Sequence, residues 1–114
     1  MPSGTILMME KMILQGERYD LVTASDGEEA VGKALAEHPD LILLDIVMPK
    51  MGGFETCQRL RAEQATKTTP IIMVTTRGEA ENVEKGYEVG CNDYVTKPIN
   101  KVELLAKVRN YLSE

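Results

Sequence analysis

Apolar residues along the chain follow two spacings that alternate. Short continuous apolar runs end in a polar residue, and between these runs apolar residues recur every three or four positions. The first spacing is typical of strands buried on both faces of a parallel sheet, and the second of helices that cover the sheet. The runs predict strands over 19–24, 40–45, 71–74 and 93–96. The helical spacings predict helices over 6–15, 27–38, 54–60, 79–89 and 101–112.

The predicted order is a helix followed by four strand–helix pairs, which is the pattern of an open parallel α/β sheet. Ser25 and Asp26 are candidates for the N-cap of the second helix, with Glu28 and Glu29 placed as in a capping box. Gly90 is suited to the residue that ends the helix over 79–89. The sheet predicted from these elements has four strands and five helices.

Composition limits the classes of function. The 114 residues suit one domain, 43% of them are apolar, and the net charge of −5 argues against nucleic-acid binding. No apolar run is long enough to span a membrane, and the N-terminus lacks a secretory signal, so we expect a cytoplasmic protein. Cys57 and Cys91 are expected to be small buried thiols in a reducing compartment.

Three polar residues follow predicted strands: Asp45, Thr75 and Lys97. Each alone has a plain structural explanation as a helix cap, a turn residue or part of a Lys-Pro pair. Because the carboxyl ends of parallel strands meet at one edge of the sheet, the fold would bring the three together. A carboxylate nucleophile, a cation and a hydroxyl donor together are suited to phosphoryl transfer.

Four stretches of the sequence resemble the receiver domains of two-component response regulators. They cover residues 23–30, 45–53, 71–76 and 90–98, in the family's order. The resemblance implies a single receiver domain over 1–114 with a CheY-like, flavodoxin-like doubly wound parallel sheet. The domain would be a signalling module and not an enzyme, without an output domain.

The resemblance also implies the role of each site residue. Asp45 would be the phospho-acceptor for a histidine kinase or phosphotransfer protein. Thr75 and Lys97 would contact the phosphoryl group, and Thr76 would border the site. Tyr94 would be the switch aromatic, reporting phosphorylation on the surface of the last two helices and last strand.

Mg²⁺ is the cofactor that the resemblance implies, held by Asp45 and the backbone carbonyl of Val47. Members of the family open with a strand that ends in an acidic pair. With a helix predicted over 6–15, that strand is missing and the pair would fall at or near Met1 and Pro2. Mg²⁺ binding and phosphorylation at Asp45 are therefore expected to be weak or absent.

A sheet without its inner strand would lose four or five buried side chains, or roughly 10 kcal/mol. Because whole domains have only about 5–15 kcal/mol of net stability, we expect the gap to be repaired. Two chains could join as a homodimer, or the strand over 19–24 could pair directly with the strand over 40–45.

Three functional hypotheses remain open from the sequence. The first is a phospho-acceptor receiver with impaired chemistry. The second is a pseudo-receiver, an interaction or dimerisation module independent of phosphorylation. The third is an engineered or mis-started fragment of an ordinary receiver. An independent metabolic enzyme is not expected, because the sequence lacks a Gly-rich phosphate loop and a cofactor fingerprint.

Overall fold

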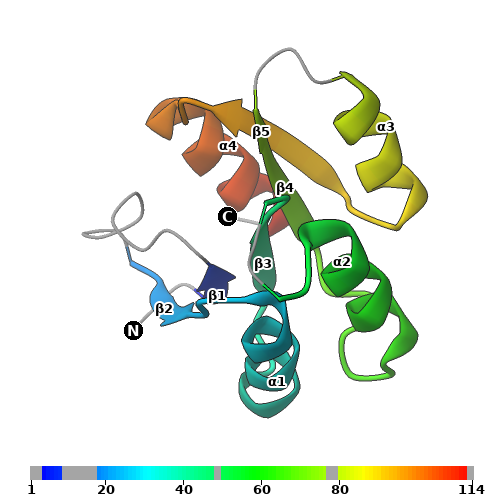
Figure 1. The fold of residues 1–114 in the computed structure, drawn as a ribbon. Coiled ribbons are helices and arrows are strands. Elements are labelled where there is room, and N and C mark those ends of the chain that lie inside the picture. The colour runs from blue at the N-terminus through cyan, green and yellow to red at the C-terminus, as the bar shows by residue number, and fades with distance from the viewer. Residues whose placement is uncertain (1–3, 9–17, 48–49, 77–79, 113–114) are drawn as a thin grey trace.

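The structure, a computed structural model, describes residues 4–8, 18–47, 50–76 and 80–112. Over these residues a parallel five-stranded sheet in the order β2-β1-β3-β4-β5 is flanked by four helices (Figure 1). The elements are β1 Thr5–Met8, β2 Asp20–Thr23, α1 Gly27–Glu37, β3 Leu41–Asp45, α2 Gly53–Ala62, β4 Ile71–Thr76, α3 Ala80–Glu88, β5 Asp93–Lys97 and α4 Lys101–Tyr111. The doubly wound α/β fold is confirmed.

The prediction of a helix over 6–15 and of a missing first strand is wrong. β1 lies between β2 and β3, paired in parallel with both, and Ile6 is fully buried. A short apolar run fits a buried strand as well as a helix, so periodicity could not decide between them. Its place inside the sheet favours a strand, because there the backbone of residues 5–8 pairs with a neighbouring strand on each side and both faces of β1 are covered. Residues 9–15 of the predicted helix lie outside the described residues.

The described part of the chain therefore contains five strands and four helices, and not the predicted four and five. The gap that a dimer or a direct contact between β2 and β3 was expected to repair does not exist, because β1 fills it. Self-association stays a prediction, without the physical reason first given for it.

Two apolar layers cover the sheet, because neighbouring residues of a strand point to opposite faces. Figure 1 shows α1 and α2 on one side of the sheet and α4 on the other. The α1 and α2 layer contains Leu7, Ile42, Leu44, Ile71, Met73, Ala30, Val31, Ala34, Cys57 and Leu60. The α4 layer contains Ile6, Met8, Leu41, Leu43, Ile72, Val74, Val95, Leu104, Leu105 and Val108.

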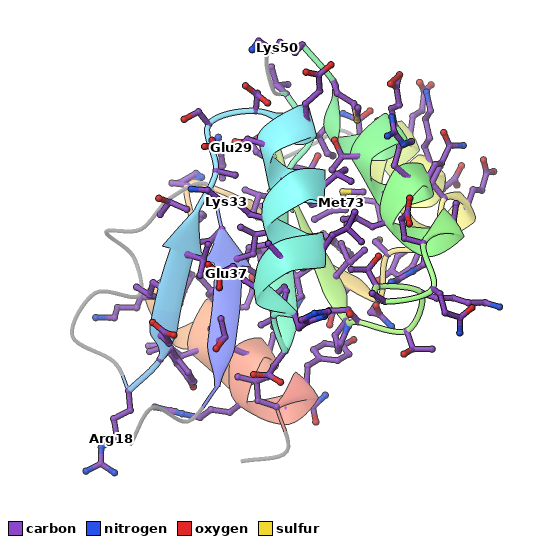
Figure 2. The ribbon with its side chains drawn as sticks, turned by 90° about the horizontal axis from the view of Figure 1, so that it is seen from below. Arg18, Glu29, Lys33, Glu37, Lys50 and Met73 are labelled. Carbon is purple, nitrogen blue, oxygen red and sulfur yellow. The ribbon has the colours of Figure 1, made fainter. Side chains whose placement is uncertain are left out.

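The start of α1 follows the sequence prediction. The Asp26 side chain accepts a hydrogen bond from the backbone N–H of Glu29 at 2.8 Å, as an N-cap residue does. Asp26 also pairs with Lys50 at 3.5 Å, which ties the loop after β3 to the start of α1. In Figure 2 the arrows of β1 and β2 point toward the end of the molecule where Lys50 lies, and Arg18 lies at the opposite end.

Within the described ranges no helix has the length and apolar character needed to cross a membrane. Cys57 and Cys91 are both free and buried, as predicted. Burial, with a further contribution from the neighbouring Cys57, raises the pKa of Cys91 to about 11. A thiol with such a pKa is protonated at neutral pH, which suits a residue of the core and not a nucleophile.

Candidate functional site

The three predicted site residues meet at the carboxyl edge of the sheet. β3, β4 and β5 are consecutive neighbours, with Asp45 opposite Val74 and Thr75 opposite Thr96. Asp45 and Lys97 are each the last residue of a strand, and Thr75 is the last but one of β4. The register therefore places a carboxylate, a hydroxyl and an ammonium group on adjacent strands.

Asp45 and Lys97 form a direct ion pair across this edge. Lys97 Nζ lies 2.6 Å from Asp45 Oδ2, and the backbone N–H of Val47 donates to Asp45 Oδ1 at 3.1 Å. The Asp45 side chain is 17% exposed and that of Lys97 is 41% exposed, so the pair is partly shielded but still in contact with solvent. The carboxylate is thus held in place with both of its oxygens oriented and still accessible to a reactant.

Thr75 contributes a hydroxyl that lacks a hydrogen-bond partner in the described part of the chain. The residue is 3% exposed, and Oγ1 is buried without a hydrogen-bond partner among the described residues. Leaving a buried hydroxyl unsatisfied costs about 1–3 kcal/mol, so such groups need an explanation. A hydroxyl one residue from the end of β4, beside the Asp45–Lys97 pair, is suited to meet an acceptor that arrives with a ligand.

Thr76 and Val47 border the same edge. The main chain of Thr76 lies opposite Lys97 in the register, and its side chain is outside the described residues. The Val47 side chain is 82% exposed, on the loop that follows β3. The peptide bond between Lys97 and Pro98 is cis.

Tyr94, the predicted switch residue, is half-buried on β5. Its ring meets that of Tyr87 edge-on, with centroids 6.3 Å apart and planes at 87°. Lys107 Nζ lies 5.0 Å from the centroid of the Tyr94 ring. Burial, and secondarily the charge of Asp93, raises the pKa of Tyr87. Sequence analysis missed Lys107, because only the packing of α4 on β5 shows which side chains it meets.

The donors for a metal ion are oxygen atoms, which suit Mg²⁺, but they are few. Asp45 supplies a carboxylate and Val47 a backbone carbonyl. Between the gaps in the description no cluster of three or more His, Cys, Asp or Glu side chains could hold a metal ion. Because β1 ends at Met8, the next residues in the sequence are Met9 and Glu10, which lie outside the described residues. The expectation that the acidic pair would fall at Met1 and Pro2 was therefore wrong in its placement.

Comparison with known proteins gives a match to one family. A family model described as the response regulator receiver domain matches residues 4–109. The transcriptional regulatory protein PhoP of alkaline phosphatase synthesis, from Bacillus subtilis (strain 168), is 42% identical over 108 residues, 95% of this chain and 44% of that protein. The chain spans less than half the length of the curated transcriptional regulators that it matches.

Solved structures show the same fold. The receiver domain of a sensor histidine kinase from Pseudomonas aeruginosa PAO1, which has a magnesium ion coordinated in its active site cleft, superposes with a TM-score of 0.89 at 26% identity, covering 97% of this chain and 98% of that chain. Chemotaxis protein CheY4 of Vibrio cholerae superposes with a TM-score of 0.86 at 33% identity, covering 94% of this chain and 97% of that chain.

Proposed function

The chain belongs to the response regulator receiver domain family of two-component signalling, and we propose that Asp45 is its phospho-acceptor. The observation that supports this most is the Asp45–Lys97 pair at 2.6 Å beside the buried hydroxyl of Thr75, which has no partner among the described residues. A nucleophile, a cation and an unused donor on three adjacent strands suit a phosphoryl group better than they suit a structural role.

The proposed reaction is transfer from a phosphohistidine of a histidine kinase or phosphotransfer protein. A carboxylate oxygen of Asp45 bonds to phosphorus while the phosphorus–nitrogen bond breaks, and the imidazole leaves with the electron pair of that bond. Lys97 and Thr75 then contact phosphoryl oxygens, the first as a cation and the second as a hydrogen-bond donor. The phosphoryl group, which carries a charge of about −1.5 to −2, supplies an oxygen that can accept a hydrogen bond from the Thr75 hydroxyl.

Mg²⁺ would be held by the Asp45 carboxylate and the Val47 carbonyl, where it would reduce repulsion between the phosphodonor and the carboxylate. We propose that this chain binds the ion weakly, because the sequence continues after β1 with Met9 and Glu10 and so offers one acidic residue where the family has a pair. Mg²⁺ commonly keeps several waters and is bound through one or two carboxylates, so a weak site remains compatible with the residues.

Intact-mass measurement after incubation with acetyl phosphate and Mg²⁺ tests the proposal. We expect slow, incomplete addition of one phosphoryl group, abolished by Asp45→Asn and reduced by chelation of the metal. The Asp45→Asn variant keeps the size of the side chain, so loss of labelling reports the carboxylate itself. Addition that persists in Asp45→Asn, or none at any donor concentration, would refute the assignment.

A pseudo-receiver is the second candidate, and the same ion pair favours it. Lys97 already neutralises Asp45, so the folded site needs no metal or phosphoryl group to hold its charge. In that case the domain binds its partner through its surface whether or not Asp45 is modified. A partner that binds the wild type and Asp45→Asn equally well, with or without phosphodonor, would decide for this function.

Three statements about nucleic-acid binding, cellular location and enzymatic activity remain proposals. With a net charge of −5, the domain is proposed not to bind nucleic acid itself, although its curated relatives are transcriptional regulators of greater length. It is also proposed to work in the cytoplasm and not to be an independent metabolic enzyme. Electrophoretic mobility shift with this domain alone would test the first of these statements.

A further inference from the structure

Lys107, on α4, makes three contacts with one dipeptide of β5. Its ammonium lies 3.0 Å from Asp93 Oδ1, donates to the carbonyl oxygen of Tyr94, and stands 5.0 Å from the centroid of the Tyr94 ring. The side chains of Lys107 and Asp93 are only 26% and 24% exposed. The contact is therefore partly shielded from water, unlike an ordinary surface ion pair.

Two of these three contacts do not depend on the Tyr94 ring. The Asp93 carboxylate is itself fixed, because its Oδ1 accepts from the backbone N–H of Tyr94 at 2.8 Å and its Oδ2 accepts from the Tyr111 hydroxyl at 3.3 Å. The Tyr94 carbonyl belongs to the outermost strand of the sheet. Lys107 is thus held by the frame of β5 and α4 wherever the ring lies.

The third contact exists only while the ring keeps its present place. The ring is then bounded by the Lys107 ammonium and by the edge-on ring of Tyr87. A contact made in one of two conformations shifts the equilibrium between them, whereas a contact made in both does not. A cation–π contact of this exposure is worth a factor of about two to five in such an equilibrium.

We infer that Lys107 is a positioning residue for Tyr94, holding its ring in the resting conformation. The inference rests on the proposed function of Asp45 as phospho-acceptor, together with the role of switch aromatic that the family resemblance implies for Tyr94. Since binding and conformation are linked, weakening the Lys107 contact should favour the other ring position and strengthen binding of a phosphoryl analogue at Asp45.

The test is NMR of the full chain with isotope-labelled tyrosine rings, the Tyr94 signals being assigned with Tyr94→Phe. Without ligand, Lys107→Met should shift the Tyr94 population about two- to fivefold toward the second ring position. Lys107→Arg, which keeps the cation, should restore the wild-type signals. Arg109→Met removes an exposed cation from the same helix and should leave them unchanged.

The second part of the test uses beryllofluoride with Mg²⁺ as the phosphoryl analogue. Urea unfolding confirms that each variant is folded. Lys107→Met should respond at a concentration of beryllofluoride about two- to fivefold lower than the wild type does. Unchanged Tyr94 signals in a folded Lys107→Met, or an equal shift in Lys107→Arg, would overturn the inference. If beryllofluoride binds the wild type without moving Tyr94, the proposed switch fails while the resting contact of Lys107 stands.

Discussion

Replacing Thr75 by valine removes a buried hydroxyl that has no partner among the described residues. Valine has nearly the same shape, and the residue is only 3% exposed, so the change trades an unsatisfied polar atom for a buried methyl group. Relief of the unsatisfied hydroxyl is worth about 1–3 kcal/mol. We expect Thr75→Val to raise the free energy of unfolding by about this amount.

Thr66 provides a matched control. It is fully buried, but its hydroxyl donates to the carbonyl oxygen of Leu60 at 2.5 Å, near the end of α2. Thr66→Val therefore breaks a satisfied hydrogen bond and should lower the free energy of unfolding by about 1–2 kcal/mol. The two variants make the same chemical change in equally buried positions, and the structure predicts opposite signs.

Urea unfolding measures both. With a slope of about 1–3 kcal/mol per molar urea, the midpoint should rise by about 0.5–1 M in Thr75→Val and fall by a similar amount in Thr66→Val. The stabilised Thr75→Val should also respond less to beryllofluoride, whereas Thr75→Ser should keep the response. A Thr75→Val variant destabilised as much as Thr66→Val would refute the reasoning, because its hydroxyl would then have a partner.

Three further predictions concern two glycines of α1, the hydrogen bonds of Arg61 and the pKa of Cys91. Gly27→Ala should destabilise by about 2 kcal/mol or more, since its Cβ would lie 2.3 Å from Thr56 Oγ1. Gly32→Ala in the same helix should stabilise by about 0.5–1 kcal/mol, because outside the helix's own nearby backbone its Cβ would meet no described atom within 4 Å. Thermal unfolding checks both variants. Arg61→Lys should cost about 2 kcal/mol or more by urea unfolding, because lysine cannot replace the guanidinium's bonds to three backbone carbonyls and one side-chain amide oxygen. Burial raises the pKa of Cys91 from 9.0 to about 11, so the folded state holds this proton more tightly than the unfolded chain. The stability from this group is complete below pH 9.0 and lost as the pH rises through about 11, and Cys91→Ala should lessen that loss in unfolding measured across this range.

The sequence predicted the site better than the first strand. Asp45, Thr75 and Lys97 could be read from their places after apolar runs, because parallel strands bring such ends to one edge. Residues 5–8 could not be assigned in the same way, because a short apolar run fits a helix or a strand equally well. Only the pairing of β1 with β2 and β3 decides for a strand.

By itself, then, the sequence determined the α/β class and the receiver family, and it predicted the candidate site residues, since these depend on residue type and order along the chain. Tertiary structure decided the position of β1, the 2.6 Å contact between Asp45 and Lys97, the burial of the Thr75 hydroxyl away from any partner among the described residues, and the place of Lys107 beside Tyr94. Each of these is a relation between side chains far apart in sequence. Periodicity carries no information on such distances, because they are set by how helices pack on the sheet.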